Sequence, residues 1–137
     1  MLRSRAVARL KSRRPGGVHV LDMGAGTGLL SMMAVRAGAA SVVGAEINRH
    51  MCDVAEECLA SNGCLGRVTM LDRDVRRMAA EPGPDGAPAD LERRVDLLIY
   101  EVGGLARGEG RGWGEGKRSR LVSAVHGGPT STLKIPG

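Results

Sequence analysis

The sequence has 137 residues, which is enough for one small domain, and its formal net charge is +5. It contains one Trp, one Tyr and no Phe, so a core has to be built from aliphatic side chains. No apolar run is long enough to cross a bilayer, and the basic start of the chain lacks the apolar stretch of a secretory signal, so we expect neither a membrane span nor a secreted protein.

The charge is distributed unevenly along the chain. Residues 1–14 carry six Lys and Arg and no acid, residues 103–137 carry six basic and two acidic side chains, and residues 15–102 carry eight basic and thirteen acidic ones. We therefore expect an acidic folded part, which suits a basic substrate, between two basic ends. Basic ends are able to contact nucleic-acid phosphates, but we expect them to be solvated segments.

The first segment, residues 1–17, is predicted to be a basic helical extension. Leu2, Val7 and Leu10 supply the apolar side of an amphipathic helix over residues 1–14, and the run Pro15-Gly16-Gly17 ends it. Arg residues without acid also give this stretch a loose likeness to a transit peptide, and that alternative stays open.

The most informative stretch is residues 18–46, VHVLDMGAGTGLLSMMAVRAGAASVVGAE. It predicts a strand over Val18–Met23, a glycine loop, a helix over about Thr27–Ala37 and a second strand over Ser41–Ala45 that is followed by Glu46. This order is typical of a nucleotide-binding βαβ unit with an acid where a ribose lies. The Glu46 carboxylate is able to accept hydrogen bonds from both ribose hydroxyls.

The spacing of the glycines favours S-adenosylmethionine over a dinucleotide. A dinucleotide fingerprint reads G-x-G-x-x-G, whereas here Gly24, Gly26 and Gly28 read G-x-G-x-G and Leu29 stands in place of the third glycine. S-adenosylmethionine has no phosphate but has a sulfonium cation, and Asp22 supplies negative charge just before the loop. A tight strand-to-helix turn without a ligand is the alternative, and a nicotinamide-dependent enzyme is disfavoured.

The remaining predicted elements continue the α/β pattern, beginning with Asn48 as a helix cap. We predict a helix over Arg49–Ser61 that ends at Asn62-Gly63, a strand over Arg67–Leu71, a turn or short helix over Val75–Ala80, a loop over residues 81–90 and a strand over Val95–Glu101. Residues 103–137 contain ten glycines and little periodicity, so we predict a disordered, Gly/Arg-rich low-complexity tail.

Cys52, Cys58 and Cys64 are spaced six residues apart. No C-x-x-C pair is present, so we expect no zinc site and no other metal site. Free thiols in a reducing compartment are the expectation.

Taken together, these motifs resemble the class I S-adenosylmethionine-dependent methyltransferases, and more narrowly the protein arginine methyltransferases. The run VLDMGAGTGLLSMMAVRAGA is especially similar to the arginine-monomethylating (type III) branch, and Glu46, Asn62-Gly63 and the strand RVDLLIYE continue the match over about residues 18–102. The resemblance implies a Rossmann-like α/β fold, here partial, with about four parallel strands and flanking helices. It also implies methyl transfer from S-adenosylmethionine to an arginine guanidino nitrogen of proteins.

The resemblance also assigns cofactor-binding residues. It places Glu46 on the ribose, Val75 on the face of the adenine, and the loop residues on the methionine end, namely Asp22, Gly24, Gly26 and Gly28. The family commonly has an acid for the adenine amino group where this chain has Arg76. We expect Asp74 either to take that role or only to cap the following turn.

Two glutamates after the fourth strand carry the chemistry in this family. A guanidinium stays protonated at neutral pH, and two carboxylates orient it and draw its charge away from the reacting nitrogen. Glu101 matches the first of these catalytic residues, and Glu109, within the Gly/Arg-rich run, is the candidate for the second. A surface acid is the simpler alternative at either position.

The resemblance ends abruptly after Val102. The family's full seven-stranded sheet, its β-barrel with a dimerisation arm and its N-terminal tyrosine-bearing helix have no counterpart. We therefore predict a partial methyltransferase domain over residues 18–102, between the basic extension 1–17 and the tail 103–137, and expect a truncated or mis-spliced form of a longer enzyme. The fourth strand would then be an exposed apolar edge.

The resemblance implies arginine-containing protein substrates, with histones and RNA-binding proteins as examples, and a location in the cytoplasm or nucleus. We expect no membrane partner and no direct nucleic-acid partner. Two alternatives stay open: a non-catalytic S-adenosylmethionine-binding pseudo-enzyme, and a methyltransferase for another substrate class, such as small molecules.

Overall fold

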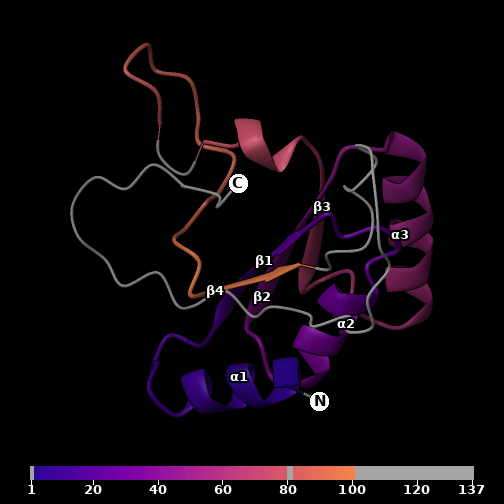
Figure 1. Ribbon diagram of the computed structural model, residues 1–137, viewed down its shortest axis with the longest axis vertical. Coiled ribbons are helices and arrows are strands. Elements are labelled where there is room, and N and C mark those ends of the chain that lie inside the picture. Colours follow the sequence, from indigo (N-terminus) through magenta and orange to yellow (C-terminus); the bar gives the residue numbers. More distant parts are fainter. Residues whose placement is uncertain (1, 80–81, 101–137) are drawn as a thin grey trace, which may run out of the picture.

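The computed structural model describes residues 2–79 and 82–100 (Figure 1). The elements in chain order are α1 (Leu2–Lys11), β1 (His19–Met23), α2 (Leu29–Arg36), β2 (Ser41–Glu46), α3 (Arg49–Ser61), β3 (Val68–Asp72), a 3₁₀ turn (Val75–Arg77) and β4 (Leu97–Tyr100). The predicted tail over residues 103–137 lies outside the described residues. Among the helices of the described part, none is both long and apolar enough to cross a membrane.

The strands form one four-stranded parallel sheet in the order β3-β2-β1-β4. This arrangement confirms the predicted Rossmann-like α/β fold with flanking helices. The strands β1, β2 and β3 follow one another toward one edge of the sheet, and β4 then lies on the other side of β1. The order in which strands are added therefore reverses between β1 and β4, although all four strands are parallel. In open α/β sheets, ligands bind outside the carboxyl ends of the strands at such a switch point.

One face of the sheet is covered by helices. Residues of α1, α2 and α3 share a single apolar core with the strands, and its buried members are Val7, Val18, Val20, Met32, Ala34, Val35, Ala39, Val42, Leu59, Cys64, Val68, Leu97 and Ile99. Aliphatic side chains and cysteine therefore build this core without an aromatic residue, as the composition requires.

The opposite face is covered by the β3–β4 connection instead of a helix. Met78 and Leu91 from this connection pack on Leu21, Ala45 and Leu98 of the sheet. Among the described residues of the connection, the 3₁₀ turn is the one helical segment, and residues 82–96 contain neither helix nor strand. This observation agrees with the loop predicted over residues 81–90, where prolines interrupt the backbone hydrogen bonding of a helix.

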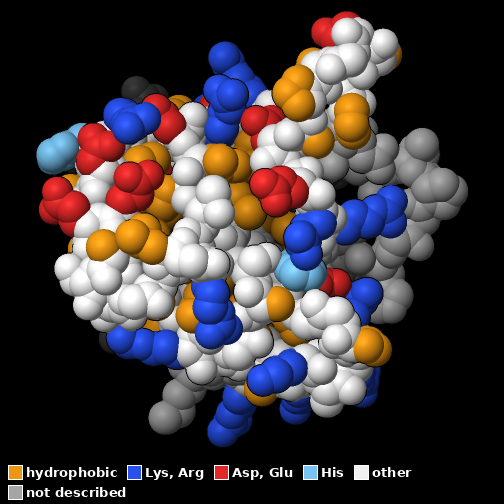
Figure 2. All heavy atoms as spheres, turned by 180° about the vertical axis from the view of Figure 1, so that it is seen from behind, with side chains coloured by type: hydrophobic (Ala, Val, Ile, Leu, Met, Phe, Trp, Pro, Cys, Tyr) orange, Lys and Arg blue, Asp and Glu red, His pale blue; other side chains and the backbone are white. Residues whose placement is uncertain are grey.

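The amino-terminal helix differs from the expected solvated extension. The Val7 side chain is only 1% exposed and belongs to the same core as Val18 and Val20, while Ala6 and Leu10 pack at its border. Helix α1 is thus part of the packed body, because its apolar stripe is buried while Arg5 and its other described cations face solvent. Figure 2 shows basic side chains gathered over α1 and acidic ones over α3.

Several element boundaries differ from the predicted ones by one to three residues, and the starts of α2 and β4 each differ by two. Helix α2 begins at Leu29 instead of Thr27, because Gly28 has a φ of 77° and is the residue that precedes the first helical turn. Strand β4 begins at Leu97 instead of Val95, and just before it the Asp96 carboxylate accepts a hydrogen bond from the His19 backbone N–H at 2.9 Å. The predicted bounds of α3 are confirmed, with the Asn48 side chain as its cap.

Candidate cofactor-binding site

The glycine loop connects β1 to α2 at the carboxyl end of the sheet. Gly24, Gly26 and Gly28 have φ values of 71°, 54° and 77°, in the left-handed region that side chains with a Cβ rarely adopt. A Cβ added to Gly24 would meet no atom within 4 Å, and one added to Gly26 would meet only the Met51 methyl at 3.9 Å. The backbone conformation therefore requires glycine here, and the space above the loop is open.

The loop is anchored on the neighbouring strand β2. The backbone N–H groups of Gly24 and Ala25 both donate to the Ala45 carbonyl oxygen, at 2.8 and 3.1 Å. A Cβ on Gly44 would lie 3.0 Å from the Ala25 Cβ and 2.7 Å from the Met70 sulfur. Gly44 thus makes room for the loop, a role that the sequence reasoning missed although a glycine inside a strand signals a close approach.

Glu46 lies beside this loop, although twenty residues separate it from Gly26 in the sequence. Its Oε2 accepts a hydrogen bond from the Gly26 N–H at 2.9 Å, and its Oε1 accepts one from the Asn48 N–H at 2.9 Å. Each carboxylate oxygen has a second lone pair, so both oxygens are able to accept a further hydrogen bond. The carboxylate is therefore held in place by the backbone and is half-exposed toward a ligand.

Asp22, the acid before the loop, is fully buried. Its Oδ2 accepts a hydrogen bond from the Ser31 hydroxyl at 2.7 Å, and Ser31 is fully buried as well. The carboxylate therefore lies beneath the loop and not on its surface, so its influence on a ligand is electrostatic. The sequence reasoning missed Ser31, whose signal is a lone hydroxyl within the apolar helix LLSMMAVR.

Asp74 caps the 3₁₀ turn, which is one of the two roles left open by the sequence. Its carboxylate accepts hydrogen bonds from the Arg76 backbone N–H at 3.0 Å and from the Arg76 Nη2 at 2.6 Å. These bonds, first of all those from the guanidinium, lower the pKa of Asp74 to about 2. The role of Asp74 toward adenine stays a prediction, and Val75 lies half-buried against the apolar cluster on this face.

The segment that carries Asp74 is joined to Glu46 through the backbone. The Arg73 N–H donates to the Glu46 carbonyl oxygen at 3.0 Å, and Glu46 pairs with Asp72 in the sheet. Cys52 contacts the same carbonyl through its thiol at 3.6 Å, and burial raises the pKa of that thiol. The three cysteines are free, in agreement with the expected unpaired thiols.

The predicted catalytic residues Glu101 and Glu109 lie outside the described residues. Strand β4 ends at Tyr100, which pairs with Met23, the residue directly before the glycine loop. The last residue of β4 therefore lies beside the glycine loop, next to the candidate cofactor site.

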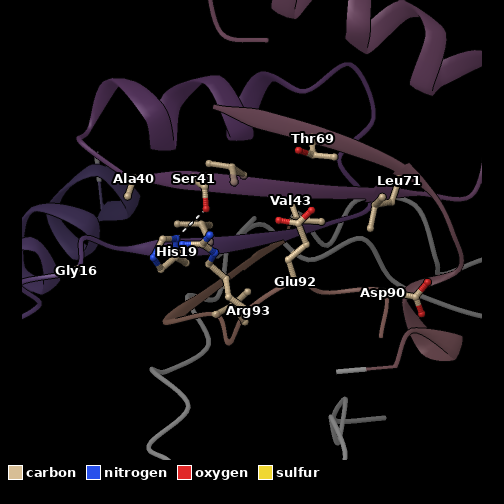
Figure 3. Close-up of a pocket in the computed structure, with 13 residues that line it drawn as sticks. Gly16, His19, Ala40, Ser41, Val43, Thr69, Leu71, Asp90, Glu92 and Arg93 are labelled. Carbon is tan, nitrogen blue, oxygen red and sulfur yellow. Dashed lines mark hydrogen bonds between the residues drawn. The ribbon is translucent and has the colours of Figure 1, made fainter. Parts of the chain in front are cut away.

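A hollow of about 410 Å³ lies elsewhere, between the sheet and the β3–β4 connection (Figure 3). His19 and Ser41, the first residues of β1 and β2, line it and share a hydrogen bond of 2.8 Å. It extends from the amino ends of β1 and β2 along the sheet to Leu71 near the end of β3, and none of its lining residues belongs to the glycine loop. Because ligands of this fold class bind at the carboxyl ends, we assign the cofactor site to the loop and not to this hollow.

Comparison with known proteins agrees with this geometry. Residues 20–87 match the model of a methyltransferase domain family. The chain is 45% identical over 84 residues to the Anopheles gambiae protein named protein arginine N-methyltransferase 7, a match that covers 61% of this chain and 11% of that protein. The chain spans 11% to 13% of the length of the curated relatives that it matches first.

Solved structures show the same relationship at the level of the fold. Arabidopsis thaliana protein arginine methyltransferase 10 superposes with a TM-score of 0.54 at 26% identity, over 72% of this chain and 25% of that one. The Trypanosoma brucei PRMT1 enzyme–prozyme heterotetrameric complex with AdoHcy gives a TM-score of 0.54 at 28% identity, over 73% of this chain and 28% of that one. Both similarities cover most of the part of this chain that folds around the sheet.

Proposed function

We infer that this chain is a methyltransferase of the protein arginine methyltransferase family and that it binds S-adenosylmethionine at the glycine loop. The matching methyltransferase domain model, the sequence relatives and the similar solved structures support this inference. One observation carries the proposal: the Gly26 N–H donates to the Glu46 carboxylate at 2.9 Å, so the loop and the ribose acid form one preorganised site. The solved Trypanosoma relative, in complex with AdoHcy, supports the same cofactor here.

The residues present fit such a cofactor. The open space above Gly24 and Gly26 admits the ligand close to the backbone, and Glu46 has the free lone pairs to accept both ribose hydroxyls. The apolar Val75 is the proposed surface for the adenine, and Asp22 places negative charge beneath the cationic methionine end. When bound, the cofactor supplies an electrophilic methyl group on a sulfonium.

The proposed reaction is methyl transfer to a guanidino nitrogen of arginine in proteins. Glu101 is proposed to hold the guanidinium, and Glu109 is the second candidate carboxylate. Two carboxylates would localise positive charge away from the reacting nitrogen and fix its direction of approach, after which that nitrogen loses a proton. Histones and RNA-binding proteins are proposed substrates, and the free cysteines support a reducing compartment, the cytoplasm or nucleus.

A label-transfer assay tests the enzymatic part of the proposal. The 137-residue chain is incubated with cofactor carrying a tritiated methyl group and a Gly/Arg-rich peptide, and the label on the peptide is counted. Transfer above that of a Glu101→Gln variant supports the reaction. If the chain binds the cofactor but transfers no label, the second candidate holds, which is a non-catalytic S-adenosylmethionine-binding protein.

The second candidate has a specific observation in its favour. The matches cover 25% and 28% of the two solved arginine methyltransferases. Cofactor binding depends on the glycine loop and Glu46, which are present, whereas transfer also requires a site for the arginine substrate. Binding measured by calorimetry, alongside the label count, separates the two candidates.

A further inference from the structure

The strongest unexplained feature of the candidate site is the buried pair of Ser31 and Asp22. Both side chains have zero exposure, and the Ser31 hydroxyl donates to the Asp22 Oδ2 at 2.7 Å. That distance is typical of a charge-assisted bond from a hydroxyl to a carboxylate. Among the described residues, Asp22 and Ser31 are the buried polar or charged side chains.

The pair closes the glycine loop at its base. Asp22 is on β1 and Ser31 is in the first turn of α2, so the hydrogen bond joins the two elements that the loop connects. On the other side, the loop is fastened by the Ala45 carbonyl and by Glu46. The hydroxyl of Ser31 therefore fixes both the direction of the Asp22 carboxylate and the start of α2.

Burial of a carboxylate is costly unless hydrogen-bond donors or positive potential compensate it. The Ser31 hydroxyl is one such donor, and the positive end of the α2 dipole lies in the same turn. A donor to the charged form favours the charged form. The Ser31 hydroxyl is therefore a donor that compensates part of the cost of burying the Asp22 carboxyl group beneath the loop, out of contact with water.

We propose that Ser31 is a positioning residue that makes the site discriminate the sulfonium cation of S-adenosylmethionine from the neutral sulfur of S-adenosylhomocysteine, by holding the Asp22 carboxylate beneath the glycine loop. The inference rests on the proposed function, because it concerns the same cofactor site. Electrostatic attraction to a cation is strong in a poorly screened interior, so the charge matters more for the sulfonium than for the thioether. Ser31 itself touches neither ligand.

The test compares the affinities of the two ligands by calorimetry in the full chain. In Ser31→Ala, we expect the affinity for S-adenosylmethionine to fall about tenfold, and that for S-adenosylhomocysteine to fall by about threefold or less, as the loss of a bond to a charged group allows. Ser31→Thr keeps a hydroxyl and should restore the wild-type ratio. Ser61→Ala is the matched control, since that hydroxyl donates to the Glu57 carbonyl on the exposed side of α3.

A double-mutant cycle with Asp22→Asn tests whether the two residues act as a unit. In the Asn background, Ser31→Ala should no longer change the ratio of the two affinities, because the negative charge is already gone. If Ser31→Ala lowers the affinities for both ligands by the same factor, Ser31 has a merely structural role and the inference is overturned. The inference is also overturned if neither affinity changes. If the folded wild-type chain binds neither ligand, the proposed function itself fails.

Discussion

Among the individual residues, Glu46 connects the most parts of the candidate site. Its two oxygens accept from the N–H groups of Gly26 and Asn48, and its carbonyl accepts from the Arg73 N–H. One side chain therefore ties together the glycine loop, the cap region of α3 and the segment after β3. The same carboxylate would bind the ribose, so a ligand meets a group that needs no rearrangement.

Replacement of Glu46 by glutamine tests whether its carboxylate binds the ribose in addition to connecting the parts of the site. In Glu46→Gln, we expect the dissociation constant for S-adenosylhomocysteine to rise about 10- to 100-fold, because hydrogen bonds to a charged acceptor are lost. Calorimetry measures the change. Glu56→Gln, an exposed acid on α3, is the control and should bind as the wild type does. Equal affinity in Glu46→Gln would rule out the ribose role.

The Asp74–Arg76 pair makes a prediction about pH. The pKa of Asp74 is lowered to about 2 from an ordinary value of 3.8, chiefly by the Arg76 side chain. Its contribution to stability is therefore complete above about pH 4 and is lost as the pH falls toward 2. In Arg76→Gln, the pKa should rise toward 3.8, and carbon NMR of the carboxyl group during a pH titration measures it.

Arg77→Gln is the control for this titration, because Arg77 is the smallest contributor to the lowered pKa of Asp74. We expect it to leave that pKa close to 2. A pKa near 2 in Arg76→Gln would show that the side-chain hydrogen bond is not the main cause.

At the scale of secondary-structure elements, the glycine loop packs closely against strand β2 because Gly44 has no side chain. A Cβ on Gly44 would lie 2.7 Å from the Met70 sulfur, which is at the end of a flexible side chain, and 3.0 Å from the Ala25 Cβ, so both neighbours would have to move. In Gly44→Ala, the rigid loop has to shift, and we expect unfolding in urea to require about 1–3 kcal/mol less free energy, together with weaker cofactor binding.

Gly66→Ala provides the matched control for that substitution. Gly66 has an ordinary φ, and a Cβ there would meet no atom within 4 Å, so its stability and binding should stay near those of the wild type. Ala25→Gly combined with Gly44→Ala removes one of the two close contacts and should recover part of the lost binding. If Gly44→Ala has the stability and the cofactor affinity of the wild type, close packing of the loop on β2 does not depend on glycine at this position.

Helix α1 gives a second prediction at this scale. Because Val7 is 1% exposed in the main core, we expect Val7→Ala to lower the free energy of unfolding by about 1–3 kcal/mol. Arg9→Ala, on the exposed side of the same helix, should change it by less than about 0.5 kcal/mol. Equal, negligible effects in urea titrations would instead describe a helix detached from the core.

At the scale of the whole molecule, the two faces of the sheet are covered unequally. Three helices cover one face, whereas the connection between β3 and β4 covers the other and leaves a hollow beside His19 and Ser41. A molecule covered in this way has a modest core on its second face. Ligand binding then has a large relative effect on its stability.

We therefore expect S-adenosylhomocysteine to stabilise the whole chain. At a hundred times its dissociation constant, the ligand should raise the free energy of unfolding by about 2.7 kcal/mol, visible as a higher melting temperature in scanning calorimetry. Hydrogen exchange should slow at Gly24, Gly26 and Glu46 and should stay unchanged around His19 and Ser41. Protection at the hollow instead of the loop would relocate the site.

The sequence by itself determined the order of the elements and the residue types at the candidate site. The alternation of apolar strands and amphipathic helices, the glycine spacing and the terminal acid of β2 predicted the parallel sheet, the loop and the ribose acid, because these depend on local backbone preferences and on side-chain type. The exact start of α2 and of β4 was missed by about two residues, and a particular conformation at Gly28 and a particular contact at Asp96 directly precede these starts.

Only the tertiary structure decided which partners these residues meet. It buried Val7 with the sheet, turned Arg76 back onto Asp74, and placed Gly44 beneath Ala25. It also put Asp22 under the loop with Ser31 as its donor instead of on the ligand-facing surface. The physical reason is that burial and hydrogen bonding between residues distant in sequence depend on how the layers pack, and local pattern carries no information about that packing.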